Sequence, residues 1–328
     1  MVGPGEWAGT ESPDKPMPGL PGQVAVPLAR RHVGRVNRPN HALIEAGGTK
    51  FVLGVGSAPD AIRATTRIAT TTPGETIPAM LDWLAGFAPF DAIGLATFGP
   101  VELDRASPGW GRILATPKPH WQGADLAGAL IRRFACPLGL DTDVNGAALA
   151  EWTWGAGRGH GTVVYLTVGT GIGGGAVING RPVHGLGHPE MGHMRVPRHP
   201  DDTAFAGCCP FHGDCLEGLA SGTAIAARWG ASLSDLPADH PAHAIIAWTL
   251  AQAVVTVQAL LAPGRIVIGG GVLHAPGLIE RIAAIAADMG AGYFRGRAQD
   301  IVTLPGLGER AGLLGALALA QAAMPLRR

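Results

Sequence analysis

The chain has 328 residues, a formal net charge of +0 and 15% charged residues, with 50 glycines and 27 prolines. This length allows two domains of ordinary size, each with its own core, and the composition indicates a soluble globular protein with many tight turns. The neutral balance excludes a global electrostatic attraction to nucleic acid. A small basic cluster near the start does not alter this balance; it consists of Arg30, Arg31, Arg35 and Arg38.

Residues 1–40 are rich in Pro, Gly and Arg and show no periodic apolar pattern, which predicts a disordered N-terminal extension. They lack the apolar run of a secretory signal, so we expect a cytoplasmic protein. A transit peptide or a later start at Met17 remains an alternative for this segment. Prolines interrupt every candidate helix, so no DNA-binding helix-turn-helix is expected here.

The folded part is predicted to begin at His41, where ALIEAGGTKFVLGVG indicates an apolar strand, a glycine turn and a second apolar strand. A Walker loop passes from a strand into a helix, whereas these glycines pass into another strand. The turn is therefore predicted to be a hairpin cradle that holds a phosphate through backbone N–H groups and the Thr49 hydroxyl. Taken alone, it is also typical of an ordinary turn. The turn residues are Gly47, Gly48, Thr49 and Lys50.

The same pattern recurs half a chain later, in VVYLTVGTGIGGGAVING over residues 163–180. A repeated strand, glycine turn and strand favours two similar domains that face one another. The second turn would then hold phosphates from the opposite side, with an ordinary glycine-rich hairpin as the alternative. Its candidate residues are Gly169, Thr170, Gly171, Gly173 and Gly174.

Between the hairpins, residues 78–86 are predicted to be helical, and DAIGLATFGPVEL indicates a strand that ends in a loop. ILATPKPHW, residues 113–121, is a further loop. Lysine is scarce in this chain, so Lys118 between two prolines is a candidate functional residue as well as a candidate surface residue. The residues of these loops that we assign to substrate binding are Gly99, Pro100, Thr116 and Lys118.

Asp143 is the candidate catalytic residue. An amphipathic helix in ADLAGALIRRFACPL leads to a strand that should end near Thr142, and a helix should start near Asn145. This places Asp143 at a strand end, where α/β sheets bind ligands. The competing interpretation is that Asp143 is only the N-cap of the helix.

The stretch from His188 to Gly222 combines metal-ligand residues with carboxylates. Cys209, His212 and Cys215 form C-x2-H-x2-C, and His193 is the candidate fourth ligand, which together suit a closed, structural zinc site. Cys208 adjoins Cys209 and is an alternative ligand. A disulfide is the other interpretation, but the chain has 4 cysteines and no visible secretory signal.

Two carboxylates flank this predicted metal site. Glu190 precedes His193 in E-M-G-H, and Glu217 follows Cys215 by two residues. A metal-fixed loop would hold both carboxylates against a polyhydroxylated ligand. Each glutamate alone is equally typical of a solvated surface.

The remaining segments are predicted as a helix at 220–229, a long apolar helix at 244–262, a buried strand RIVIGGGV and a closing helix. The long helix is nearly long enough to span a membrane, but Gln252 and Gln258 interrupt it, and a buried helix explains it better. Gly269, Gly270 and Gly271 after the strand would let a flat base or ribose approach the backbone, or would only form a tight turn. The closing helix is expected to pack back on the first domain.

In order along the chain, these motifs resemble the ROK family of sugar kinases, and closely its zinc-containing bacterial fructokinase branch. The motifs are EAGGTKF, FGPVEL, TPKPHW, DTDVNGAALAE, VGTGIGGG, GHPEMGH, CPFHGDCLEGLASG and IVIGGGV. The resemblance covers the chain from about His41 onward and implies an α/β, actin-like (ribonuclease H-like) ATPase fold with an interdomain cleft. The domains would be residues 41–151 and 152–308, with the helix 309–325 packed on the first.

The resemblance further implies transfer of the γ-phosphoryl group of ATP, with Mg²⁺, to a hexose hydroxyl, above all the 6-hydroxyl of fructose. Kinases for mannose, glucose or N-acetylmannosamine are alternatives, as is a non-catalytic sugar-responsive regulator of the same fold. We expect a homodimer and no nucleic-acid or membrane partner. Two departures from the common family pattern are Glu45 in place of Asp and Thr142 in place of Asn.

Residue by residue, the resemblance assigns Asp143 as the catalytic base. It assigns sugar or metal contacts to Asn145, Glu190, His193 and Glu217. Phosphate binding falls to Gly47, Gly48, Thr49, Lys50, Gly169, Thr170, Gly171 and Gly173, and adenosine binding to Gly269, Gly270 and Gly271. The structural zinc would be held by His193, Cys209, His212 and Cys215.

Overall fold

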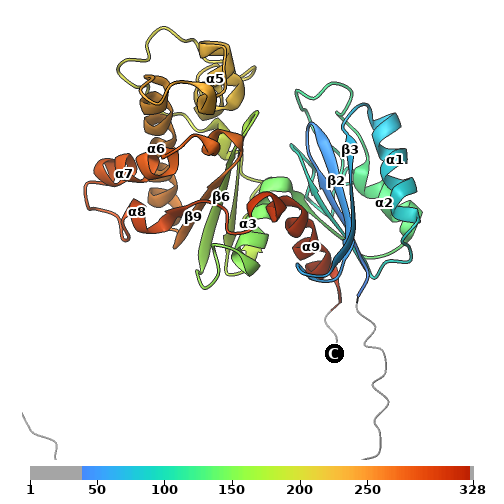
Figure 1. Ribbon diagram of the computed structural model, residues 1–328. Helices are drawn as coiled ribbons and strands as arrows, with labels where there is room; N and C mark the ends of the chain where they lie inside the picture. The colour runs from blue at the N-terminus through green and yellow to red at the C-terminus, as the bar shows by residue number, and fades with distance from the viewer. Residues whose placement is uncertain (1–38, 326–328) are drawn as a thin grey trace, which may run out of the picture. The chain divides into compact units, whose positions relative to one another are not determined.

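The computed structural model describes residues 39–325 (Figure 1). The disorder predicted for residues 1–40 therefore falls, except for Pro39 and Asn40, outside the described residues.

The first sheet has 5 strands in the order β3-β2-β1-β4-β5. β1 pairs antiparallel with β2 and parallel with β4, β2 pairs antiparallel with β3, and β4 pairs parallel with β5. The central strands are almost wholly buried because helices cover both faces, whereas β3 alternates between exposed and half-buried residues, as expected of an edge strand. The strands are β1 (His41–Ala46), β2 (Lys50–Gly56), β3 (Ile62–Ala69), β4 (Ala92–Thr97) and β5 (Leu138–Thr142).

The second sheet also has 5 strands, in the order β10-β9-β6-β7-β8. β6 pairs antiparallel with β7 and parallel with β9, just as β1 pairs with β2 and β4. The expectation of two similar α/β units, based on the recurring glycine hairpins, is confirmed by this repeated topology. The strands are β6 (Thr162–Val168), β7 (Ile172–Ile178), β8 (Arg181–Pro182), β9 (Arg265–Gly269) and β10 (Val302–Thr303).

Helices α1 (Pro73–Ala85) and α2 (Leu126–Phe134) cover one face of the first sheet, and α9 (Ala311–Ala323) covers the other (Figure 1). The helix predicted from residue 78 begins five positions earlier, because Pro73 suits the first helical turn. Glycines bring α9 down onto the strands. A Cβ on Gly94 of β4 would lie 1.7 Å from the Ala316 carbonyl oxygen, and one on Gly139 of β5 would lie 2.1 Å from that of Leu319.

Helix α3 (Asp143–Trp154) follows β5 and contacts α9 as well as β6 and β7 of the second sheet. The two helices cross where Gly146 meets Gly315, since a Cβ on Gly315 would lie 2.4 Å from the Gly146 carbonyl carbon. The proposed domain boundary at residue 151 falls inside α3. The division into 41–151 and 152–308 remains a proposal.

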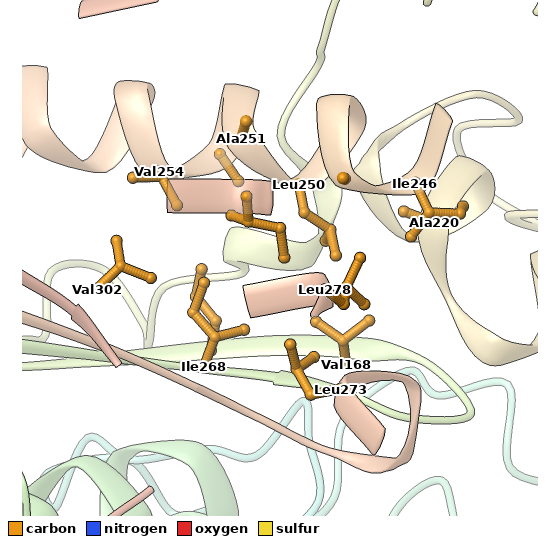
Figure 2. Close-up of a cluster of buried hydrophobic side chains, with 14 of the residues drawn as sticks. Val168, Ala220, Ile246, Leu250, Ala251, Val254, Ile268, Leu273, Leu278 and Val302 are labelled. Carbon is orange, nitrogen blue, oxygen red and sulfur yellow. The ribbon is translucent and has the colours of Figure 1, made fainter. Parts of the chain in front are cut away.

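The second sheet is covered by α6 (Ala242–Leu261) and α7 (Leu278–Gly290), with α8 (Ala298–Ile301) beside them. Among the described residues, α6 is the one helix long and apolar enough to cross a membrane, and 56% of its most apolar window is buried. Figure 2 shows Ile246, Leu250 and Val254 of α6 packed in the same cluster as Val168 and Ile268 of the sheet. Its apolar character is therefore used in a protein core.

The helix predicted over residues 220–229 is present as α5 (Gly222–Trp229), and a short helix that was not predicted, α4 (Leu216–Ala220), precedes it. Ser221 separates them, because its backbone is extended and its hydroxyl accepts a hydrogen bond from the backbone N–H of Ala224 at 3.1 Å. Serine at an N-cap starts a new helix rather than continuing the old one. The change of direction lies next to the Cys and His residues of the candidate metal site.

Candidate active site and metal cluster

Asp143 is the first residue of α3, directly after β5. The N-cap is Thr142, whose hydroxyl accepts a hydrogen bond from the backbone N–H of Asn145 at 3.2 Å. The alternative interpretation of Asp143 as the cap is therefore wrong. The Asp143 carboxylate accepts the neighbouring Val144 N–H at 2.9 Å and is half-buried at the end of the strand.

The pKa of Asp143 is raised to about 7, first by loss of hydration and then by the negative charge of Glu45. Glu190 adds to the shift, while the Val144 N–H opposes it. The pKa of Glu45 is itself raised by burial, against the opposing charges of Lys50 and Arg67. Asp143 thus has the protonation behaviour of a general base that works near neutral pH.

The first glycine turn leaves most of its residues at the surface. Gly48, Thr49 and Lys50 are exposed, and a Cβ on Gly48 would meet no atom of the described chain within 4 Å. The base of the turn is closed by Gly47, whose N–H donates to the Lys50 carbonyl at 3.0 Å and whose carbonyl accepts from the Thr70 hydroxyl at 2.7 Å. The exposed tip has the open space that a phosphate needs.

The second turn is tied to its neighbours more closely. The Gly169 carbonyl accepts from the Gly222 N–H at 2.7 Å, and the Thr170 carbonyl accepts from the Thr223 hydroxyl at 2.7 Å. Glu217 accepts the Ile172 N–H at 2.9 Å, just after the turn. Glu217, which is predicted as a sugar contact, therefore supports the second glycine turn, and the sequence did not indicate this contact.

Of the three glycines after β9, two are required by the protein's own packing. A Cβ on Gly269 would lie 2.8 Å from the Tyr165 hydroxyl oxygen. Gly270 has a φ of +96°, and a Cβ on it would lie 2.4 Å from the Val168 carbonyl oxygen. A Cβ on Gly271, in contrast, would meet no atom of the described residues within 4 Å. Of the three, Gly271 is thus the one left open at the surface where adenosine is predicted to bind.

His188 was not among the predicted site residues, yet it connects several of them. Its Nε2 accepts a hydrogen bond from the Val101 N–H at 3.2 Å, and its Nδ1 lies 3.4 Å from the Glu190 carboxylate. Gly99 lies directly against the ring, because a Cβ there would be 3.1 Å from His188 Cε1. The Gly99–Pro100 loop and Glu190 are therefore brought together, and the only sequence signal for this was the place of His188 in GHPEMGH.

Three other predicted contacts lie elsewhere. Asn145 is 0% exposed, and its side-chain amide donates to Asp141 at 2.8 Å, so it has no surface to offer a sugar in this structure. Thr116 and Lys118 lie in their own loop, where the Thr116 hydroxyl accepts the Lys118 N–H at 3.3 Å. Within residues 39–325, neither forms a hydrogen bond or ion pair with Asp143.

Asp141 instead makes a buried network beneath the site. It is 2% exposed and lies 2.9 Å from His184 Nε2, and this hydrogen bond raises the pKa of His184. Asn145 donates to the other carboxylate oxygen. The network joins the end of β5 to the segment after β8, and it explains why Asn145 is buried: its polar group is required internally.

The four predicted metal ligands converge. The ligand atoms of His193, Cys209, His212 and Cys215 all lie within 4.8 Å of one another. Cys209 Sγ is 3.7 Å from both His193 Nδ1 and His212 Nδ1, and Cys215 Sγ is 3.5 Å from His193 Nδ1. Cys208 is outside this cluster, which decides between the two adjacent cysteines in favour of Cys209.

The model of the ROK family matches residues 42–323. The chain is similar to a fructokinase of Zymomonas mobilis subsp. mobilis, with 50% identity over 86% of this chain and 97% of that protein. It is also similar to a putative fructokinase of Bacillus subtilis, with 41% identity over 86% and 95% of the two chains. Among solved structures, it resembles a ROK family glucokinase from Streptomyces griseus in complex with glucose and AMPPNP, with a TM-score of 0.69, 27% identity and coverage of 86% and 99%.

Proposed function

The chain belongs to the ROK family, and on this premise we propose that it is an ATP-dependent fructokinase that phosphorylates D-fructose at the 6-hydroxyl. The observation that carries the proposal is the 50% identity with a fructokinase over nearly the whole of both proteins. The identity with the glucokinase of known structure is only 27%. Fructose is therefore favoured over glucose as the substrate.

In the proposed mechanism, Asp143 accepts the proton of the sugar hydroxyl as the phosphoryl group is transferred. Its pKa of about 7 keeps a large fraction of the carboxylate deprotonated at neutral pH. Glu190 and Glu217 orient the sugar through its neighbouring hydroxyls. The exposed tip of the first turn, Gly48 and Thr49, and the turn Gly169–Gly171 supply N–H groups for the phosphates of ATP.

The carboxylates also fit a divalent cation. Glu45 and Glu190 are close enough to Asp143 for their negative charges to raise its pKa. This repulsion is what a bound Mg²⁺ would reduce, and Glu45 is the residue we propose to hold it with ATP. When bound, Mg²⁺ supplies charge neutralisation on the phosphates.

The Cys and His cluster fits zinc. Tetrahedral zinc with Zn–S of about 2.3 Å and Zn–N of about 2.0 Å places sulfur and nitrogen ligands roughly 3.5 Å apart. The three sulfur–nitrogen distances of 3.5, 3.7 and 3.7 Å agree with this value. We propose a structural zinc, because two thiolates and two imidazoles fill all the tetrahedral positions.

Cytoplasmic location and a homodimer are part of the same proposal. A zinc site built on thiolates suits a reducing compartment, and the described cysteines form no disulfide. Sedimentation equilibrium of the purified protein tests the dimer.

The proposed function is tested by Mg²⁺- and ATP-dependent ADP release with fructose, glucose, mannose and N-acetylmannosamine. We expect the highest kcat/KM for fructose. Asp143→Asn should lower kcat by about 10²-fold or more while fructose binding, measured by calorimetry, stays nearly unchanged. A higher kcat/KM for another of the sugars would show that fructose is not the preferred substrate. An unchanged turnover number in Asp143→Asn would show that Asp143 is not the catalytic base.

A further inference from the structure

His188 is the anchor of an otherwise exposed segment. Residues 184–187 are all exposed, whereas the His188 side chain is 7% exposed. The contact reaches from this segment, which follows β8 of the second sheet, to Val101, which follows β4 of the first. The two residues are 87 positions apart in the sequence.

The partner of His188 is fixed in place. Val101 is 2% exposed and pairs with Ile113 in an isolated β-bridge. The Pro100 carbonyl accepts the Leu114 N–H at 2.7 Å. A hydrogen bond to this loop therefore fixes the direction of the imidazole ring, and Gly99 leaves just enough room for the ring beside it.

The Val101 contact also determines the tautomer. A backbone N–H only donates, so His188 Nε2 must accept and the proton of the neutral ring lies on Nδ1. The protonated Nδ1 then lies 3.4 Å from the Glu190 carboxylate. Glu190 is 47% exposed on its side chain, so this contact restrains a carboxylate that solvent would otherwise leave free to rotate.

From these contacts we infer that His188 is a positioning residue, which orients the Glu190 carboxylate for the sugar relative to the Gly99–Val101 loop. The inference rests on the proposed sugar kinase function and adds a residue to it. The hydrogen bond from the Val101 N–H fixes the orientation and the tautomer of the His188 ring. The protonated Nδ1 then orients the Glu190 carboxylate. Loss of either contact of His188, with Val101 or with Glu190, should weaken sugar binding without affecting the phosphate turns.

Two variants each remove one of these two contacts. The amide of His188→Asn occupies the region of Nδ1 and donates to Glu190, but is too short to reach Val101. The amide of His188→Gln reaches toward Val101 and loses the Nδ1 donor. We expect both variants, and His188→Ala, to raise KM for fructose by about tenfold, with KM for ATP and kcat changed by less than about threefold.

His199→Asn is the matched control. His199 also faces a carboxylate, with Nδ1 3.8 Å from Asp201, but within the described part of the chain it forms no hydrogen bond or ion pair with the Gly99–Val101 loop or Glu190. The variant should retain the wild-type kinetic constants. Thermal midpoints of all variants show whether a change in KM reflects general loss of structure.

A double-mutant cycle tests whether His188 acts through Glu190. In a Glu190→Ala background, His188→Ala should change KM for fructose by less than about twofold, because the side chain that His188 orients is gone. An equal effect of His188→Ala in both backgrounds, or unchanged KM in all His188 variants, overturns the inference. Wild-type protein that phosphorylates none of the sugars would instead overturn the proposed function, so the two failures are distinguishable.

Discussion

At the scale of single residues, the proposed chemistry depends on carboxylates that come from different parts of the chain. Glu45 lies near the end of β1, Asp143 begins α3, and Glu190 precedes the candidate metal ligand His193. Each is ordinary in its local sequence. Lost hydration and the negative charges of the two glutamates give Asp143 its pKa of about 7.

This pKa predicts a pH dependence for the reaction. Because the deprotonated carboxylate is the base, kcat/KM for fructose, which reports the free enzyme, should be low below pH 7 and rise to a plateau above it. Glu45→Gln removes a negative neighbour, so the pKa of Asp143 falls and the rise in kcat/KM moves to lower pH. The midpoint of the profile of kcat/KM against pH measures this, even where the variant is slower overall.

The matched control for this prediction is Glu280→Gln. Glu280 is an exposed acid in the first turn of α7, away from the carboxylate group at Asp143. Its removal should leave the midpoint where it is in the wild type. An unshifted midpoint in Glu45→Gln would show that Glu45 does not raise the pKa of Asp143.

At the scale of elements, the segment from His193 to Cys215 has little regular structure to hold it. It contains the end of a short 3-10 helix, Met191–His193, and two isolated bridges. Ion pairs of Asp214 with Arg195 and Arg198 support it from outside the metal cluster. Cys215 is then the N-cap residue of α4, which carries Glu217. A metal here would fix both Glu190 and Glu217.

Loss of the metal should therefore weaken substrate binding. We expect Cys209→Ser to lose bound zinc, to lower the thermal midpoint and to raise KM for fructose, because the loop between the two glutamates loosens. KM for ATP should rise as well, since Glu217 supports the second phosphate turn through Ile172. Metal analysis, thermal unfolding and steady-state kinetics measure these effects.

Cys208→Ser is the control for Cys209→Ser. The two residues are adjacent and chemically identical, but only Cys209 lies in the cluster. Cys208→Ser should retain about one zinc per chain. If only Cys208→Ser lost zinc, Cys208 rather than Cys209 would be the ligand. Normal kinetic constants in zinc-free Cys209→Ser would show that the metal does not affect substrate binding.

At the scale of the whole described chain, the two sheets are linked through α3 and α9. Helix α9 packs on β1 and β4 of the first sheet, and α3 packs on β6 and β7 of the second. The crossing at Gly146 and Gly315 has no room for a side chain. This crossing places Asp143, at the start of α3, next to both sheets.

Gly315→Ala should therefore destabilise the protein by about 1–3 kcal/mol. Its Cβ would lie 2.4 Å from backbone of Gly146, so α9 has to move away from α3. Chemical denaturation measures the change. Gly74→Ala is the control, because a Cβ on Gly74 in α1 would have only the Thr72 hydroxyl oxygen near it, at 4.0 Å, among the described residues. Equal stability of the two variants would show that the helices accommodate a methyl group.

Local patterns were sufficient for much of the fold. Alternation of apolar strands with glycine turns identified both hairpins, and the spacing of Cys209, His212 and Cys215 identified the metal cluster, because neighbours in sequence must be neighbours in space. The position of Asp143 was predicted for the same reason, since it lies between a strand end and a helix start. These features follow from backbone geometry over a few residues.

Other features depend on packing between distant segments. The place of Cys209 rather than Cys208 in the cluster, the cap at Thr142 and the contact of His188 with Val101 each required the positions of surrounding elements. Asn145 looked accessible from its motif but is buried, because α3 presses against β7, where Gly175 leaves room for its side-chain oxygen. Sequence spacing determined which side chains were available for chemistry. Which of them face one another was decided only by long-range packing, since the free energy of such contacts depends on elements that the local pattern does not contain.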